Sequence, residues 1–290
     1  MFNKSVLGHL SALGCVILFS QAGVSYRVIR GYCSPLETVV CVMALAFLLL
    51  NLVYLPRLHL KKNSNELWFA LSGLFIALSF YFYIKTPLSN SALSIVMTAC
   101  PLLCACVTRL FIKGERLTAV FFIGFAFSLV GTFMISWGRI GESRFTLIGC
   151  IYALLTALSL GAYFVAAKRV ASFGHNIVQS ARRVLFWVLV FLTVLVFVWN
   201  FNIQSYKALL TLTPMLHLMF LSFVCVGAGM SFWIYSLRHI GSIKTASYMY
   251  ALPVISVVAA SLSGGVTINA LTLIGVILTI VGITLSVKKK

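Results

Sequence analysis

Long apolar runs separated by short polar segments make up almost the whole chain. Ten of these runs approach the roughly 20 residues that an α-helix needs to cross the ~30 Å hydrocarbon core of a bilayer. The pattern therefore predicts an all-α integral membrane protein with ten transmembrane helices and no separate soluble domain. The predicted spans are 7–29, 34–55, 66–86, 88–110, 117–137, 146–167, 178–200, 211–237, 242–263 and 269–287.

The second half of the chain repeats the pattern of the first. Each half has a proline deep in its fourth apolar run, a tyrosine 18 residues before that proline, and two glycines seven residues apart in its fifth run. Such self-similarity dictates architecture, and it predicts two five-helix units, residues 1–140 and 141–290. The matching pairs are Tyr83 and Tyr235, Pro101 and Pro253, Gly124 and Gly275, and Gly131 and Gly282.

The repeated prolines and glycines carry different predictions. Proline inside a helix removes one backbone hydrogen bond and clashes with the preceding turn. Two such prolines at equivalent places in a repeat, Pro101 and Pro253, favour a hinge or binding region near the membrane midplane. Glycines seven residues apart keep a small surface on one helix face, which favours close helix packing over ligand contact.

Composition and charge agree with a lipid environment. Hydrophobic residues form 61% of the chain and charged residues 9%, whereas soluble domains are typically about a quarter charged. The net charge is +18. With both termini inside, sixteen basic residues fall on the inner side and six on the outer side, a positive-inside bias. We therefore predict a multi-pass protein of the inner (plasma) membrane with cytoplasmic termini, in contact with membrane lipid and without nucleic acid as a partner.

Polar and aromatic side chains inside the spans are the candidates for contact with a small-molecule substrate. Ser and Gln in a membrane helix need partners, and aromatic rings offer stacking surfaces. For each candidate the alternative is structural, namely interhelical hydrogen bonding, packing, or an aromatic belt at the membrane interface. The predicted substrate-binding residues are Gln21, Ser25, Phe80, Tyr83, Met97, Tyr163, Trp233, Tyr248 and Tyr250.

Acids are scarce, and this limits the chemistry. The chain has no Asp and four Glu, namely Glu37, Glu66, Glu115 and Glu142, each near a helix end or in a loop. Proton-driven transporters commonly bury a carboxylate within a span, so the sequence favours a facilitator or exchanger. His217 is the only histidine that we place inside a span, and a structural role is favoured for it over proton relay.

Enzymatic and metal sites are not predicted. Intramembrane catalysis generally needs paired carboxylates, a His/Asp set or a metal site, and we assign no catalytic residue. The eight cysteines lack metal-binding spacings and are interpreted as packing residues. We expect no metal and no cofactor.

The order of these features resembles the EamA-like branch of the drug/metabolite transporter superfamily over essentially the whole chain. The resemblance rests on Pro101, the segment Lys113 to Leu117 (KGERL), the paired glycines and Pro253. It implies two inverted five-helix repeats, cytoplasmic termini and alternating access for a small metabolite. It also implies a central cavity lined mainly by the first, third, fourth, sixth, eighth and ninth helices.

Two departures from the family pattern stand out. The first helix has Phe19-Ser20-Gln21 where the family often has Trp-Gly-Ser, and the Gly264-Gly265 region replaces the second family Glu. The predicted function is transport of an amino acid or a nucleoside-like or aromatic compound, with no requirement for an oligomer. The alternative is a phosphate-ester, nucleotide-conjugate or other anion exchanger of the same superfamily. Its anion would be held by Arg27, Lys85, Lys168 and Lys244.

Overall fold

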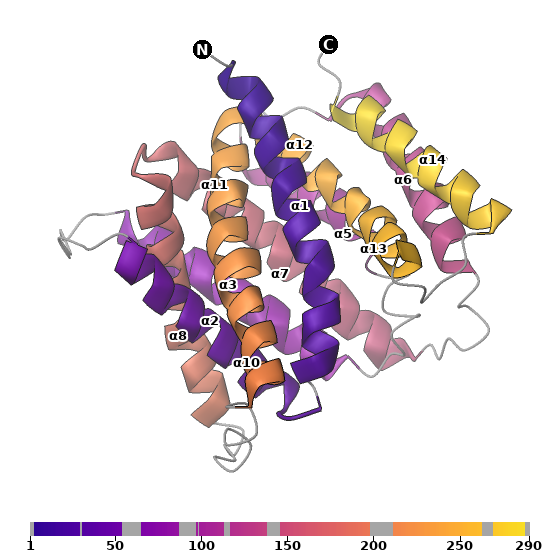
Figure 1. Ribbon diagram of the computed structural model, residues 1–290. Helices are drawn as coiled ribbons and strands as arrows, with labels where there is room; N and C mark the ends of the chain where they lie inside the picture. Colours follow the sequence, from indigo (N-terminus) through magenta and orange to yellow (C-terminus); the bar gives the residue numbers. More distant parts are fainter. Residues whose placement is uncertain are drawn as a thin grey trace.

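The computed structural model describes residues 3–29, 31–53, 65–86, 97, 99–112, 117–137, 146–197, 211–262 and 269–287 (Figure 1). Within these ranges the chain is helical, with no strand. The helices of the first half are α1 (Lys4–Ile29), α2 (Pro35–Val53), α3 (Glu66–Lys85), α5 (Cys100–Phe111) and α6 (Ala119–Trp137). Those of the second half are α7 (Leu147–Ser172), α8 (Ile177–Phe197), α10 (Leu212–Met219), η3 (Phe220–Ala228), α11 (Gly229–Ile240), α12 (Ser242–Ser247), η4 (Tyr248–Tyr250), α13 (Ala251–Leu262) and α14 (Ala270–Val287).

Eight helical stretches of the described residues are long and apolar enough to cross a membrane. They coincide within a few residues with eight predicted spans, so the structure confirms an all-helical, multi-pass membrane protein. Within the fourth predicted span the structure describes the shorter apolar helix α5, and residues 87–96 and 98 lie outside the described part. The ninth predicted span is covered by α12, η4 and α13, which follow one another with a change of pitch.

The eighth span changes its winding halfway along. The α-helix of α10 passes into the π-helical segment η3 and then into α11, without a break in the chain. A π-helical turn is wider than an α-helical turn and often occurs at functional sites. It alters the direction in which the side chains of α11 project relative to those of α10.

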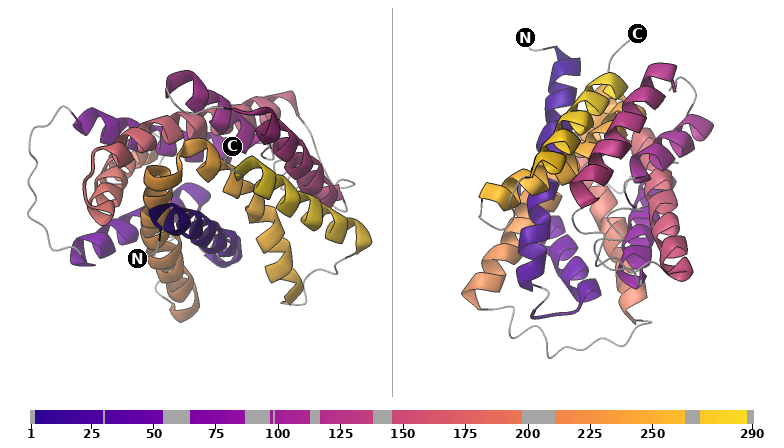
Figure 2. Two further views of the ribbon diagram at one scale, coloured as in Figure 1. Left: turned by 90° about the horizontal axis from the view of Figure 1, so that it is seen from above. Right: turned by 90° about the vertical axis from the view of Figure 1, so that its right-hand side faces the viewer.

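The helices pack in pairs that join the two halves of the chain. α1 lies along α11, α3 lies along α7, α2 contacts α8, and α6 lies along α14. The pair formed by α6 and α14 is seen at the right of Figure 1 and remains together in both further views (Figure 2). Each half therefore forms its main helix contacts with the other half.

The repeated glycines form the contact between α6 and α14. A Cβ atom added to Gly131 would lie 2.5 Å from the Gly275 carbonyl oxygen, and one added to Gly282 would lie 2.5 Å from the Gly124 carbonyl oxygen. Only glycine permits backbones to approach this closely. The prediction of close packing is confirmed, and the two glycine pairs prove to be each other's partners.

One end of the bundle gathers the beginning of α1 and the ends of α7, α11 and α14 (Figure 1). A Cβ on Gly8 would lie 2.8 Å from the Ile240 side chain, which places the start of α1 beside the end of α11. Lys168 Nζ donates to the Leu237 carbonyl oxygen at 2.6 Å, joining the ends of α7 and α11. We call this the α1-start end of the bundle.

The two repeated prolines do not lie in helix interiors, which corrects the expectation from the sequence. Pro101 is the second residue of α5, and Pro253 is the third residue of α13. In the first turn of a helix the missing N–H has no intrahelical partner to lose. The break in regular winding therefore precedes the proline, as the 3₁₀ turn Tyr248–Tyr250 shows for Pro253. A role as hinges stays a prediction for both.

Candidate functional site

α1, α7 and α11 pack together in the middle of the bundle. The Cys15 thiol of α1 donates to the Gly229 carbonyl oxygen at the start of α11 (3.1 Å). The Cys225 thiol of η3 donates to the Leu18 carbonyl oxygen of α1 (3.2 Å). These two bonds join α1 to the eighth span at the transition from π-helix to α-helix. Because both thiols bond backbone groups, they act structurally here, as predicted for packing residues.

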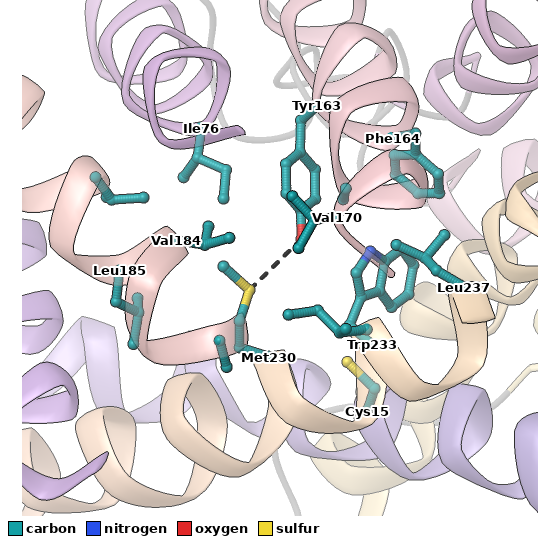
Figure 3. Close-up of a cluster of buried hydrophobic side chains, with 14 of the residues drawn as sticks. Cys15, Ile76, Tyr163, Phe164, Val170, Val184, Leu185, Met230, Trp233 and Leu237 are labelled. Carbon is teal, nitrogen blue, oxygen red and sulfur yellow. Dashed lines mark hydrogen bonds between the residues drawn. The ribbon is translucent and has the colours of Figure 1, made fainter. Parts of the chain in front are cut away.

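α7 faces α11 through aromatic side chains (Figure 3). The Tyr163 hydroxyl donates to Met230 Sδ at 3.5 Å. Phe164 meets Trp233 edge to face, with ring centroids 5.1 Å apart. Phe164 is fully buried, and Tyr163 and Trp233 are only 4% and 5% exposed. We call Cys15, Tyr163, Phe164, Met230 and Trp233 the central cluster.

The ninth span brings two tyrosines toward the same core. Tyr250 is buried and meets Phe125 of α6 at 6.0 Å between ring centroids. The hydroxyl of Tyr248, two residues earlier, lies 3.0 Å from His9 Nδ1. His9 lies in α1, so the expectation that His217 is the only histidine inside a span was wrong.

Two further candidates lie toward the far end of α1. Ser25 is buried, and its hydroxyl lies 3.1 Å from His217 Nδ1 of α10. This bond joins two helices, in agreement with the structural role predicted for His217. Gln21 is half-buried, and its side-chain nitrogen donates to the Ser20 hydroxyl at 3.5 Å.

The structure thus divides the nine predicted substrate-binding residues into groups. Tyr163, Trp233 and Tyr250 belong to one buried core cluster, and Phe80, Met97 and Tyr248 pack against it. Gln21 and Ser25 lie farther along α1, outside this cluster. Tyr83 is 47% exposed, which separates it from the buried group.

Among the basic residues proposed for anion binding, Lys168 already serves as a donor to the last turn of α11. Arg238 likewise donates to the carbonyl oxygens of Ala171 (2.9 Å) and His175 (2.7 Å). Basic groups that bond carbonyls at helix C-termini stabilise the helix ends. The contacts of Lys168 and Arg238 therefore tie α7 to α11.

The two described acids are bonded at helix starts. Glu37 accepts from the Ser34 backbone N–H (2.9 Å), while the Ser34 hydroxyl accepts from the Glu37 N–H (3.4 Å), a reciprocal capping box at the start of α2. Glu66, the first residue of α3, accepts from Arg183 and Trp187 of α8. Glu115 and Glu142 lie outside the described residues.

The Glu66 contact is a feature that sequence reasoning missed. Arg183 Nη2 lies 2.5 Å from Glu66 Oε2, and Trp187 Nε1 lies 2.9 Å from Glu66 Oε1. The guanidinium of Arg183 also lies over the Phe69 ring, 4.6 Å from its centroid. The signal in the sequence was the rarity of acids, together with an Arg-Arg pair near the start of the seventh span. Nothing in the sequence connects residues 117 positions apart.

His175 lies beside this ion pair, in the short connection between α7 and α8. Its ring is 6.2 Å from that of Phe69, and its Nε2 atom is buried with no hydrogen-bond partner in the described part of the chain. Burial, and then the positive charges of Arg183 and Arg238, lower the pKa of His175 below the ordinary imidazole value, against a smaller opposite effect of Glu66. The folded protein therefore favours neutral His175.

A pH dependence of stability follows from this environment. In the unfolded chain His175 takes up a proton near the ordinary pKa of about 6.5, whereas the folded chain resists protonation to lower pH. The stabilising contribution is therefore present above about pH 6.5 and is lost as the pH falls. Thermal unfolding in detergent between about pH 7.5 and 5.5 should show a decrease in Tm that is smaller in His175→Gln. An unchanged slope in that variant would contradict the assignment to His175.

Comparison with known proteins gives a match to a family over the second half of the chain and a likeness in fold. The sequence profile of the EamA-like transporter family matches residues 147–288. A solved crystal structure superposes on this chain with a TM-score of 0.77 at 18% sequence identity, covering 96% of this chain and 95% of that chain. At this identity the likeness concerns the fold. No curated protein sequence matches the chain.

Proposed function

We propose that the protein transports a small organic metabolite across the membrane by alternating access, because residues 147–288 match the EamA-like transporter family. The substrate is an amino acid or a nucleoside-like or aromatic compound that contacts the central cluster. The observation that carries this proposal is the convergence of buried aromatic side chains from α7, α11 and η4 where α1 joins them. Ligand sites in membrane bundles are built from such inward-facing side chains between helices.

The helix pairing supports two inverted repeats. In the repeat read from the sequence, α1 corresponds to α7 and α3 corresponds to α11. The contact between α3 and α7 then has its equivalent in the contact between α11 and α1, while α6 and α14, like α2 and α8, pair with their own counterparts. α1 begins at the end of the bundle where α7 ends, so these equivalent helices run in opposite directions (Figure 1).

The charges at the α1-start end support a cytoplasmic position for it. This end holds Lys4, Arg169, Arg183, Arg238 and Lys244, because it contains the start of α1, the ends of α7 and α11, and the starts of α8 and α12. Cytoplasmic segments are enriched in Lys and Arg. We therefore propose that both α1 and α14 reach the cytoplasmic face.

Transport without proton coupling is the expected mode. Glu37 and Glu66 are bonded at helix starts, so neither supplies a free carboxylate in the middle of a span. In proteoliposomes preloaded with unlabelled compound, counterflow of the same labelled compound should exceed that of empty liposomes. A protonophore should leave this exchange unchanged. Concentrative uptake that collapses with the protonophore would contradict facilitated transport, and absence of counterflow for every class of metabolite would contradict transport itself.

A further inference from the structure

Two hydrogen-bond donors of the central cluster lack a good acceptor. Trp233 Nε1 is buried and has no partner in the described residues. The neighbouring donor, the Tyr163 hydroxyl, is paired with the sulfur of Met230 at 3.5 Å, and a thioether is a weak acceptor. A buried donor without a good acceptor is costly. Trp233 Nε1 and the weakly paired Tyr163 hydroxyl can therefore both gain from a stronger acceptor.

Two backbone acceptors of α1 and the eighth span already accept from thiols. The Gly229 carbonyl oxygen accepts from Cys15, and the Leu18 carbonyl oxygen accepts from Cys225. The two described carboxylates are bonded elsewhere, Glu37 at the start of α2 and Glu66 at the start of α3. Trp233 Nε1 therefore has no acceptor in the described part of the chain, and the Tyr163 hydroxyl has only the weak thioether acceptor of Met230.

The two donors project from facing helices. Trp233 follows Met230 by three residues on α11, so the two side chains occupy one face of that helix, and Met230 contacts Tyr163 of α7. Figure 3 shows the indole nitrogen of Trp233 and the hydroxyl of Tyr163 in the region between α7 and α11, with Phe164 beside the indole. A ligand group here would meet two donors and an aromatic edge.

We propose that Trp233 Nε1 and the Tyr163 hydroxyl bind a planar oxygen acceptor of the transported molecule, either a carboxylate or an amide carbonyl, while its apolar part packs against Phe164. This inference rests on the proposed transport function and specifies its substrate class. The Tyr163 hydroxyl turns from Met230 Sδ to the stronger acceptor. A substrate that presents only an ammonium group finds no acceptor here and is disfavoured.

Three compounds with one scaffold test the head group: 3-phenylpropionate, 3-phenylpropanamide and 3-phenylpropylamine. A ligand that binds the folded protein raises its Tm with concentration. The acid and the amide, or one of them, should raise the Tm of the purified protein, and the amine should not. Stabilisation by the acid alone identifies a carboxylate substrate, and stabilisation by the amide identifies a carbonyl. Equal stabilisation by the amine, or by none of the three, would overturn the inference.

Variants that keep the ring and remove the donor locate the site. Trp233→Phe and Tyr163→Phe should each weaken binding of the stabilising compound about tenfold or more, since each removes a hydrogen bond to a charged or strongly polar group. The ligand-free protein should lose little stability in Trp233→Phe, because that variant also removes an unpaired buried donor. A purely structural role of Trp233 would give the opposite result, namely lower stability and unchanged affinity.

Matched variants complete the experiment. Trp68→Phe removes an indole that lies under Arg169, and Tyr32→Phe removes the hydroxyl of an exposed tyrosine between α1 and α2. Both should bind as the wild type does.

The same four variants are then measured in counterflow. Transport that survives Trp233→Phe and Tyr163→Phe at full affinity would overturn this inference and leave the transport function intact, whereas absence of counterflow for every compound class would remove the function on which it rests.

Discussion

Alanine at Gly131 or Gly282 is expected to destabilise the protein by about 1–3 kcal/mol, the usual cost of forcing an extra methyl group into a packed interface. At both positions the added Cβ would lie 2.5 Å from a carbonyl oxygen of the partner helix, and the obstacle is backbone that no rotamer change can move. α6 and α14 must therefore separate along their length. In lipid, close packing is a main source of helix association, so the substitution should directly weaken the association of α6 with α14. Thermal unfolding and size-exclusion profiles in detergent measure it.

Gly23 provides the matched control for this prediction. It lies in α1, and a Cβ added there meets nothing within 4 Å. Gly23→Ala should leave the Tm unchanged or raise it, because alanine is the better helix former by about 1 kcal/mol. Gly131→Ala and Gly282→Ala proteins as stable as Gly23→Ala would show that α6 and α14 are not packed through these glycines.

The helices could be predicted from the sequence because the bilayer places one dominant constraint on any segment that crosses it. Every backbone group within the bilayer must be bonded inside its own segment, so a long apolar run predicts a helix with nearly correct ends. The spans predicted at 66–86 and 269–287 differ by at most a residue at each end from α3 and α14. The repeat added the prediction of close packing at the paired glycines.

The central cluster could not be derived in the same way. Aromatic residues in a span look alike whether they face lipid, another helix or a substrate, and only packing decides. Tyr83 and Tyr163 have similar surroundings in the sequence, yet one is 47% exposed and the other 4%. The contact of Tyr163 with Met230 joins residues 67 positions apart. The π-helical segment η3, which redirects the side chains of α11, has no signature in the apolar pattern.

The prolines show how a correct signal can mislead about local geometry. The equivalent positions of the two prolines correctly indicated an interruption of the regular helix near Pro253, where a 3₁₀ turn precedes α13. The expectation that both prolines lie in a helix interior differs from the structure, because proline is most compatible with the first turn of a helix. The chain therefore changes its winding before the proline, and the proline begins the next segment.

Glu66→Ala is the second change with a large expected effect, a loss of about 1–3 kcal/mol of stability. It leaves Arg183 and the indole N–H of Trp187 without their acceptor, and it leaves the Arg183 charge over Phe69 and near His175. The side chains of Arg183 and Glu66 retain 15% and 30% exposure, so solvent reduces the penalty below that of a fully buried pair. Thermal or chemical unfolding in detergent measures the loss.

A double-mutant cycle separates the pair from the individual side chains. Glu66→Gln and Arg183→Gln should each destabilise the protein, and the double variant should be more stable than the sum of the two losses predicts, because the second change removes a partner already lost. Arg169→Gln is the control, since Arg169 lies at the same end of the bundle but over Trp68. Its effect should add to that of Glu66→Gln. Simple additivity of Glu66→Gln with Arg183→Gln would show that the contact between α3 and α8 does not depend on this ion pair.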